Sequence, residues 1–392
     1  MELDTTYGAH NYHPIPVVIS KAKGIHVWDP EGRKYIDMLS CYSALNQGHR
    51  HPKVIKAAKK QLDLVTLTSR AFHNDKLGPF LKKLTRVTGM EMALPMNTGA
   101  EAVETGIKVA RRWAYRKKMV PEGQAEIIVC ANNFHGRTTT IVGFSSDEDS
   151  RDGFGPFTPG FKVIPYNDVQ ALEAAITPNT AAFLVEAIQG EAGVIVPSEG
   201  YLKQVREICT KNNVLLMLDE IQTGFCRTGK MFCFQHEGIK PDILLVAKAL
   251  GGGIMPISAV LTSKEIMSVF TPGSHGSTFG GNPLACAVGE AALDVLIDEK
   301  LDKRAAKHGT YFMKRLKELQ NPFFKEVRGK GLLIAVELTK DAGPARKHTE
   351  ALMRNGLLAK ETHDTTIRFA PPLIIKKEEI DEAIEIIKKT MK

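Results

Sequence analysis

Short runs of almost wholly apolar residues limit the folds open to this sequence more than any other feature. They recur at residues 127–130, 183–185, 214–218, 243–247 and 257–261, with longer amphipathic or loop stretches between them. Strands that helices cover on both faces have this pattern. Between two of these runs, residues 201–213 place apolar side chains at helical spacing, as a crossover helix requires: Leu202, Val205, Ile208 and Cys209. The sequence therefore predicts an α/β fold built on a mostly parallel sheet.

Size, composition and charge exclude several classes of protein. At roughly 150 residues per domain, a chain of 392 residues predicts two or three domains. The apolar fraction of 43% and the charged fraction of 24% argue against a disordered, collagen-like or coiled-coil chain. The net charge of +8, from 52 basic and 44 acidic residues, is spread along the sequence and does not indicate a nucleic-acid partner.

The cysteines and the N-terminus indicate a compartment. The six cysteines include no C-x-x-C pair, so we expect reduced thiols. The first residues contain acids, aromatics and a proline where a secretory signal has a basic start and an apolar stretch. No apolar run reaches the roughly 18 residues of a membrane span. We therefore expect a cytoplasmic protein without membrane contact. We expect no metal site, because His10 and His13 lack further ligands.

The last quarter of the chain has a different pattern. Residues 331–338 and 366–370 read as strands, and the final helix carries Ile380, Ile384 and Ile387 on one face. This pattern predicts a smaller α+β domain that begins near residue 290. We expect three parts: residues 1–50 as an N-terminal arm and part of the small domain, residues 51–289 as the large domain, and residues 290–392 as the C-terminal small domain.

Lys248 is the first residue that suggests chemistry. It ends an apolar run and precedes three glycines at 251–253. Burial there is costly for an ammonium group, so desolvation favours the neutral, nucleophilic amine that can form a Schiff base. Alternatively, the stem of Lys248 lies on apolar surface while its charged end reaches water.

Asp219 follows the apolar run 214–218. In open α/β sheets, ligands bind at the carboxyl ends of the strands. A carboxylate there can keep a pyridine nitrogen protonated, which makes pyridoxal phosphate an effective electron sink. Alternatively, Asp219 caps a helix or joins a buried ion pair. Together with Lys248 at another strand end, it indicates pyridoxal phosphate more specifically than either residue alone.

The phosphate of such a cofactor has two candidate sites. Thr98, Gly99 and Ala100 precede the helical stretch 102–115, where free backbone N–H groups can bind an anion. Alternatively, Thr98 and Glu101 form only a capping box.

The second candidate is the loop 276–281, which contains Ser277 and Thr278 between glycines and is otherwise a flexible connection. Residues 224–231 fit the nucleotide-binding pattern G-x-x-x-x-G-K. However, Met231 stands where that loop needs a hydroxyl for magnesium. We therefore reject a nucleotide site at residues 224–231.

Taken in order and spacing, these residues resemble the class III (omega) aminotransferases over nearly the whole chain. The match includes Lys248, Asp219 with Gln222, and the stretches 98–100, 134–137 and 277–278. Longer stretches are most similar to family members that act on ornithine: YGAHNYHPIPVVISKAKG, CYSALNQGHRHP, NNFHGRTTT, EAIQGEAGV and LDEIQTGFCRTGK. The resemblance implies an aspartate aminotransferase-like fold (fold type I), with pyridoxal 5'-phosphate as the cofactor.

The resemblance also implies roles at the cofactor. Lys248 carries it and shuttles a proton, Asp219 pairs with the pyridine nitrogen, and Phe134 stacks on the ring. Gln222 contacts the ring hydroxyl, and the backbone of Gly99 and Ala100 binds the phosphate. Thr278, with Ser277 as a further contact, reaches the phosphate in the neighbouring subunit, which implies a homodimer with shared active sites. Alternatively, Phe134 is a core aromatic and Gln222 a turn residue.

For the substrates, the resemblance assigns Arg137 and Tyr12 to the ornithine carboxylate and Tyr42 to its α-amino end. Arg368 would bind the α-carboxylate of 2-oxoglutarate, and Glu191 would pair with Arg368 while ornithine reacts. Alternatively, Arg368 and Glu191 form a structural ion pair, and the tyrosines are packing residues with one polar end.

The implied reaction transfers the δ-amino group of L-ornithine to 2-oxoglutarate. Its products are L-glutamate and L-glutamate 5-semialdehyde, which cyclises to pyrroline-5-carboxylate. Family members that act on acetylornithine or 4-aminobutyrate generally lack a tyrosine at the position of Tyr42. Ala187 replaces a common proline, and His135 stands where some members have tryptophan. The alternatives are an aminotransferase for acetylornithine or another omega-amino acid, and a non-catalytic binding protein on the same fold.

Overall fold

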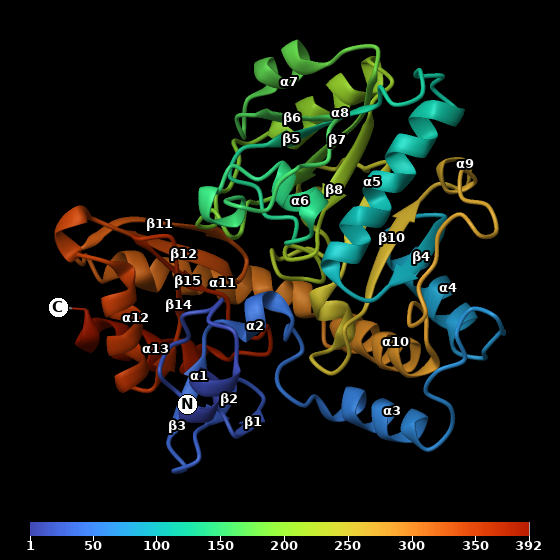
Figure 1. Cartoon of the computed structure of the whole chain (residues 1–392). Coiled ribbons are helices and arrows are strands. Elements are labelled where there is room, and N and C mark those ends of the chain that lie inside the picture. Colours follow the sequence, from blue (N-terminus) through green and yellow to red (C-terminus); the bar gives the residue numbers. More distant parts are fainter. Residues whose placement is uncertain (392) are drawn as a thin grey trace.

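The computed structural model describes residues 1–391 and has a seven-stranded central sheet (Figure 1). Its strand order is β4-β10-β9-β8-β7-β5-β6. The strands are β4 (Met92–Met96), β5 (Glu126–Cys130), β6 (Phe161–Ile164), β7 (Thr180–Glu186), β8 (Leu215–Asp219), β9 (Ile243–Val246) and β10 (Ser258–Thr262). Strand β10 is antiparallel to both of its neighbours, and the other neighbouring pairs are parallel. The predicted α/β fold with a mostly parallel sheet is confirmed.

Alternating side chains of the central strands pack on opposite faces of the sheet. In β8, Leu216 and Leu218 belong to the same apolar cluster as helix α8 (Tyr201–Lys211), the predicted crossover helix. Leu215 and Met217 instead belong to the cluster that contains helix α5 (Gly99–Arg116). Strands buried on both faces need apolar residues at every position, which explains the continuous apolar runs.

Further helices belong to the same part of the molecule as the large sheet (Figure 1). They are α3 (Pro52–Leu62), α4 (Leu77–Thr88), α6 (Thr139–Gly143), α7 (Val169–Ala175), α9 (Lys264–Met267) and α10 (Pro283–Asp298). Helix α10 packs against both α3 and α4. No helix within residues 1–391 combines the length and the apolar character needed to cross a bilayer.

The C-terminal part contains a separate antiparallel sheet of order β11-β12-β15-β14. Its strands are β11 (Phe324–Lys330), β12 (Leu333–Leu338), β14 (Lys360–Thr362) and β15 (Thr366–Phe369). The helices of this part are α11 (Leu301–Glu318), α12 (Ala345–Arg354) and α13 (Lys377–Thr390). Helix α13 buries Ile380, Ile384 and Ile387, as their spacing predicts.

The N-terminal segment joins the C-terminal part through a third sheet. Its elements are α1 (Glu2–Tyr7), β1 (Lys21–Lys23), β2 (His26–Trp28), β3 (Lys34–Asp37) and the short turn α2 (Ser40–Ser43). Strand β3 pairs in parallel with β13 (Leu357–Leu358), so the two ends of the chain share a sheet. The three-part division at residues 50 and 289 stays a prediction, and position 290 lies inside helix α10.

Candidate active site

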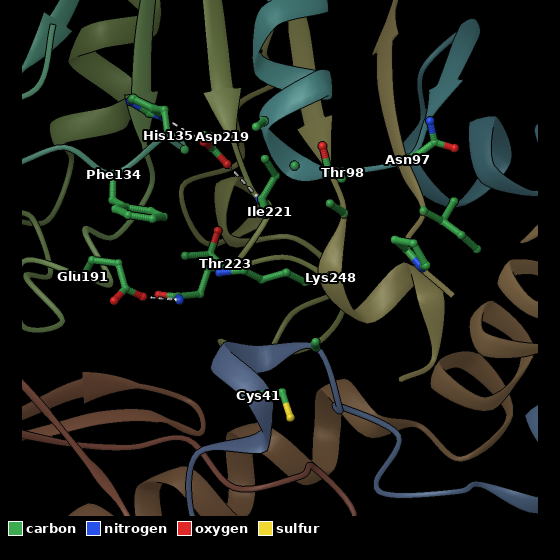
Figure 2. Close-up of a pocket in the computed structure, with 18 of the residues that line it drawn as sticks. Cys41, Asn97, Thr98, Phe134, His135, Glu191, Asp219, Ile221, Thr223 and Lys248 are labelled. Atoms are coloured by element: carbon green, nitrogen blue, oxygen red, sulfur yellow. Dashed lines mark hydrogen bonds and ion pairs between the residues drawn. The ribbon is translucent and has the colours of Figure 1, made fainter. Parts of the chain in front are cut away.

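A cavity of about 470 Å³ lies beside the ends of β7, β8 and β9 (Figure 2). Its walls come from the loops after these strands, from the start of α5, and from the N-terminal turn α2. The carboxyl ends of parallel strands converge there, as expected for a ligand site in such a sheet. Many residues that the sequence singles out line this cavity: Thr98, Gly99, Ala100, Phe134, Glu191, Asp219, Gln222 and Lys248.

Lys248 lies near the middle of the cavity (Figure 2). It begins a 3₁₀ turn directly after β9 and has a φ of 46°. Within residues 1–391 its amine has no hydrogen bond or ion pair. Desolvation lowers the pKa of Lys248, while the nearby carboxylate of Glu191 opposes this shift. The amine therefore points to the nucleophilic role that the sequence predicts.

Asp219 ends β8 and is 5% exposed. Its Oδ2 lies 2.7 Å from Nδ1 of His135, and its Oδ1 accepts a hydrogen bond from the Ile221 backbone. Because Nδ1 contacts a carboxylate oxygen, it carries the imidazole proton and donates it. The buried Nε2 atom of His135 has no partner within residues 1–391. In the sequence, His135 stands out only as a departure from the family pattern, so sequence reasoning missed its pairing with Asp219.

The start of α5 combines both of the alternatives that the sequence leaves open. Thr98 and Glu101 form the capping box, in which each side chain accepts from the other residue's backbone N–H. The N–H groups of Gly99 and Ala100, which lie between them, find no acceptor in residues 1–391 and border the cavity. A Cβ at Gly99 would lie 3.2 Å from Ile221 Cδ1. The cap therefore leaves two donors for an anion.

Glu186 is a further buried acid that sequence reasoning missed. It ends β7 and pairs in register with Asp219 at the end of β8. Its Oε2 accepts a hydrogen bond from the backbone N–H of Phe134 at 3.1 Å. Burial raises the pKa of Glu186 well above its usual value, and the Asp219 carboxylate raises it further. The signal that identified Asp219, an acid at the end of an apolar run, also marks Glu186.

Glu191 and Arg368 form an ion pair at one wall of the cavity. Arg368 Nη1 lies 2.7 Å from Glu191 Oε1, and Gln222 Nε2 donates to the same oxygen at 2.9 Å. Burial alone would raise the pKa of Glu191, but Arg368 and Lys248 lower it to about 2. Glu191 is therefore ionised. The guanidinium of Arg368, on β15, lies 5.2 Å from the ring centre of Tyr42.

Tyr42 belongs to a strained turn. All four residues of α2 have a positive φ: 45° at Ser40, 50° at Cys41, 58° at Tyr42 and 72° at Ser43. A left-handed turn of non-glycine residues costs roughly 1–2 kcal/mol per residue. Oδ1 of Asp37 offsets part of this cost by accepting hydrogen bonds from the backbone of Leu39 and Ser40. The turn brings Cys41 to the cavity, across from Lys248 (Figure 2).

Several predicted site residues lie outside the cavity lining. Tyr12 is 75% exposed, and the Arg137 guanidinium donates to Ser150. Thr278 is exposed, whereas Ser277 accepts a hydrogen bond from Asn97, which lines the cavity beside Thr98. Most of the predicted cofactor residues thus line the cavity, whereas Tyr12, Arg137, Ser277 and Thr278 do not. The Arg137 guanidinium still lies 5.7 Å from the ring centre of Phe134, which lines it. Other lining residues gave no sequence signal, among them Ile188, Ile221, Ile254 and Met255.

The residues present fit pyridoxal 5'-phosphate. The cavity lining combines a lysine amine, an acid that can hold a ring nitrogen and two free N–H groups that can hold a phosphate. The buried Oε1 of Gln222 has no partner within residues 1–391, although an amide oxygen can accept from a ring hydroxyl. Residues 1–391 contain no group of three or more His, Cys, Asp and Glu side chains able to hold a metal.

Comparisons with known proteins agree with this geometry. The family model for class-III aminotransferases matches residues 7–391. An ornithine aminotransferase of Brevibacillus brevis is 65% identical over 391 residues, covering 100% of this chain and 97% of the relative. A solved ornithine aminotransferase of Toxoplasma gondii, with partial occupancy of PLP at its active site, is 50% identical. It has a TM-score of 0.98 and covers 100% of this chain and 92% of its own.

A second solved structure is similar to this chain but carries another name. The acetylornithine aminotransferase of Elizabethkingia anophelis is 50% identical, with a TM-score of 0.90. The match covers 100% of this chain and 97% of the other chain. Overall likeness of the backbone therefore does not separate ornithine from its acetylated form, and the site must do so.

Proposed function

The chain belongs to the class-III aminotransferases, and from this premise we propose that its cavity transfers the δ-amino group of L-ornithine to 2-oxoglutarate. The enzyme depends on pyridoxal 5'-phosphate. Its products are L-glutamate and L-glutamate 5-semialdehyde, which cyclises to pyrroline-5-carboxylate. The observation that carries the proposal is the Glu191–Arg368 ion pair beside Lys248, because this pair can separate two substrates that use one pocket.

Each residue at the cofactor has a definite task. Pyridoxal 5'-phosphate, when bound, supplies an aldehyde that joins amines and a ring that withdraws electrons from the adjoining carbon. Lys248 binds it and moves a proton through its amine, which desolvation keeps available. Asp219, oriented by His135, keeps the ring nitrogen protonated. Phe134 would cover the ring, Gln222 would accept a hydrogen bond from its hydroxyl, and the backbone of Gly99 and Ala100 would bind the phosphate.

The substrate residues solve a problem of orientation. Ornithine must present its distal amine to Lys248, with its carboxylate held away by Arg137 and Tyr12 and its α-amine by Tyr42. While ornithine reacts, Glu191 neutralises Arg368, so that the guanidinium does not attract the ornithine carboxylate. 2-Oxoglutarate carries two carboxylates, and its α-carboxylate displaces Glu191 and forms a charge-assisted pair with Arg368.

We further propose a cytoplasmic homodimer in which each subunit completes the other's site. The exposed position of Thr278, away from the cavity of its own subunit, supports shared sites. Six cysteines without a disulfide support a reducing compartment. Residues 51–289 would form the cofactor-binding domain, with residues 1–50 and 290–392 in the small domain. The parallel pairing of β3 with β13 supports the joining of these two end segments.

The deciding experiment compares kcat/KM for L-ornithine and for N-acetyl-L-ornithine, with 2-oxoglutarate as acceptor. An acetyl group removes the charge of the α-amine that Tyr42 would bind, so we expect at least about tenfold preference for free ornithine. Preference for the acetylated substrate would assign the chain to acetylornithine instead. Absence of turnover with either substrate in the cofactor-loaded protein would favour a non-catalytic binding role.

A further inference from the structure

Arg227 is a buried cation that none of the roles above uses. It lies in the stretch 224–231, whose sequence resembles a nucleotide-binding loop but lacks the required hydroxyl. Its side chain is 0% exposed. Within residues 1–391, Arg227 has no ion pair, although a buried guanidinium without a carboxylate is costly. Because burying this charge costs free energy, the position of Arg227 needs a structural or functional explanation.

The guanidinium of Arg227 instead donates to four neutral oxygens from both ends of the chain. Nη1 donates to the backbone oxygens of Leu332 at 2.9 Å and Pro371 at 2.6 Å. Nη2 donates to Ser40 Oγ at 3.0 Å and Asn46 Oδ1 at 2.5 Å. Only the planar fork of arginine can reach acceptors on both sides in this way. Arg227 thus joins the large sheet's loops to the N-terminal and C-terminal segments.

One of these contacts, the bond to Ser40, leads to both substrate-binding residues. Ser40 is the first residue of the left-handed turn that contains Tyr42. The Ser40 hydroxyl in turn donates to the backbone oxygen of Ala370 at 2.6 Å, two residues after Arg368. Arg227, Ser40 and Ala370 therefore form a chain of hydrogen bonds between the Tyr42 turn and the Arg368 strand.

Asn46 provides a second connection to the loop of Arg227. It accepts from Arg227 through Oδ1 and donates through Nδ2 to the backbone oxygen of Phe225 at 2.7 Å. The same loop begins a few residues after Gln222, which bonds to Glu191. The segments that carry Tyr42 and Arg368 thus both reach this guanidinium, through Ser40 and through Pro371. A turn of four left-handed residues needs such external support, because its own backbone disfavours it.

We propose that Arg227 is a positioning residue for carboxylate recognition, which fixes Tyr42 and Arg368 relative to the cavity through Ser40. This inference rests on the proposed function, in which Tyr42 and Arg368 bind substrate. Loss of the Arg227 contacts weakens the binding of both substrates while Lys248 and Asp219 keep their geometry. A purely structural Arg227 would instead affect stability alone.

The test uses the cofactor-loaded protein with the variants Arg227→Lys and Ser40→Ala. Lysine keeps the charge without the fork, and Ser40→Ala removes one link while leaving Arg227 in place. Arg206→Lys is the matched control, because Arg206 on α8 bonds to Asp242 and does not line the cavity. For each protein, KM and kcat are measured with ornithine and with 2-oxoglutarate. Calorimetry with glutarate, an unreactive diacid, measures carboxylate binding without turnover.

We expect Arg227→Lys and Ser40→Ala to raise KM for both substrates, and the dissociation constant of glutarate, by about tenfold. The kcat value and the visible absorbance of the bound cofactor should stay close to those of the control. Unchanged KM and glutarate binding, with only a lower unfolding temperature, would overturn the proposal. If Arg227→Lys does not fold, Ser40→Ala decides. If the wild type does not use ornithine, the proposed function is contradicted. Glutarate binding by the variants would then still test whether Arg227 supports carboxylate binding.

Discussion

Glu191 and Arg368 differ in their freedom to move. In the proposed mechanism, the Glu191 carboxylate moves away from Arg368 when the carboxylate of a substrate binds there. Arg368 is 1% exposed and fixed on a strand, while the Glu191 side chain is 28% exposed at the cavity wall. Its pKa of about 2 lies below the unfolded value, so the ion pair is complete above about pH 4.5. The pair is lost only as the pH falls toward 2. It therefore persists throughout the range in which the enzyme can be assayed.

The variant Glu191→Gln tests whether this pair separates the two substrates. Without the carboxylate, Arg368 stays uncompensated and attracts the ornithine carboxylate into an unproductive orientation. We expect the single-turnover rate with ornithine to fall by at least about tenfold, and the rate with 2-oxoglutarate to change far less. Stopped-flow absorbance of the cofactor measures each half-reaction separately.

The control for this variant is Glu326→Gln. Glu326 pairs with Arg328 at 2.7 Å on β11, outside the cavity lining, so its neutralisation should leave both half-reactions unchanged. Equal losses in both half-reactions of Glu191→Gln would show that the Glu191–Arg368 pair has only a structural function.

Single residues differ in how well the sequence could predict them. Lys248 and Asp219 follow apolar strands, so their position at the cavity was predictable from the pattern alone. Glu186 obeys the same rule and could have been found. The contact of His135 with Asp219 joins residues 84 positions apart, and only the folded chain brings them together. The roles at the substrate end depend on the family resemblance and stay predictions.

At the scale of elements, the strands were easier to predict than the turns. Continuous apolar runs identify buried strands, but they do not give direction, so the antiparallel orientation of β10 has no sequence signal. The left-handed turn Ser40–Ser43 contains no glycine, the residue that normally marks a positive φ. Asp37 supports this turn locally, but the contact from Arg227 joins residues 187 positions apart, and local sequence does not reveal such a contact.

The short 3₁₀ helix Cys233–His236, which follows the Arg227 loop, makes the stability of the protein depend on pH. His236 Nε2 lies 3.0 Å from the backbone oxygen of Thr228 and donates to it. Burial, with Lys330 nearby, lowers the pKa of His236 to about 4. Between about pH 6.5 and 4 the unfolded chain therefore binds more protons than the folded one. The stability that neutral His236 contributes is complete above pH 6.5 and is lost as the pH falls.

The variant His236→Asn tests this dependence. Between pH 7.5 and 5, we expect the wild type to lose about 1 kcal/mol more unfolding free energy than His236→Asn, a value reduced for partial solvent screening. Urea unfolding at both pH values measures the difference. His363→Asn is the control, because His363 is exposed and asparagine tolerates its φ of 56°. If the wild type and His236→Asn lose equal unfolding free energy between the two pH values, His236 is not the source of the pH dependence.

At the scale of the whole molecule, the chain leaves apolar surface exposed, which a second copy would cover in the proposed homodimer. Large exposed side chains occur in the segment after α3 and in the 276–281 loop: Leu64, Val65, Leu67, Phe72 and Phe279. The side chain of Asn74 donates to the backbone oxygen of Gly281, which connects these two regions. Exposed apolar patches of this kind mark interaction surfaces. From the sequence, a homodimer is predicted only through the family resemblance, because the exposure of apolar side chains depends on the fold.

Mixed dimers of two inactive variants test whether the sites are shared. Lys248→Ala removes the reacting amine but keeps the 276–281 loop, whereas Thr278→Asp keeps the amine and places a negative charge where the partner's phosphate would bind. In a mixed dimer, the intact Lys248 site then receives an intact loop from its partner. Random exchange of equal amounts should restore roughly a quarter of wild-type activity, since about half of the dimers are mixed and each has one working site.

The two variants alone provide the reference for this recovery. Each homodimer should show little activity, and the mixture should regain it only after subunit exchange, for example by refolding the two proteins together. If Thr278 served its own subunit, the Thr278→Asp subunit would stay defective with any partner, and mixing would recover nothing. Recovery therefore distinguishes a loop that reaches across the interface from one that folds back on its own site, a distinction that a single inactive variant cannot make.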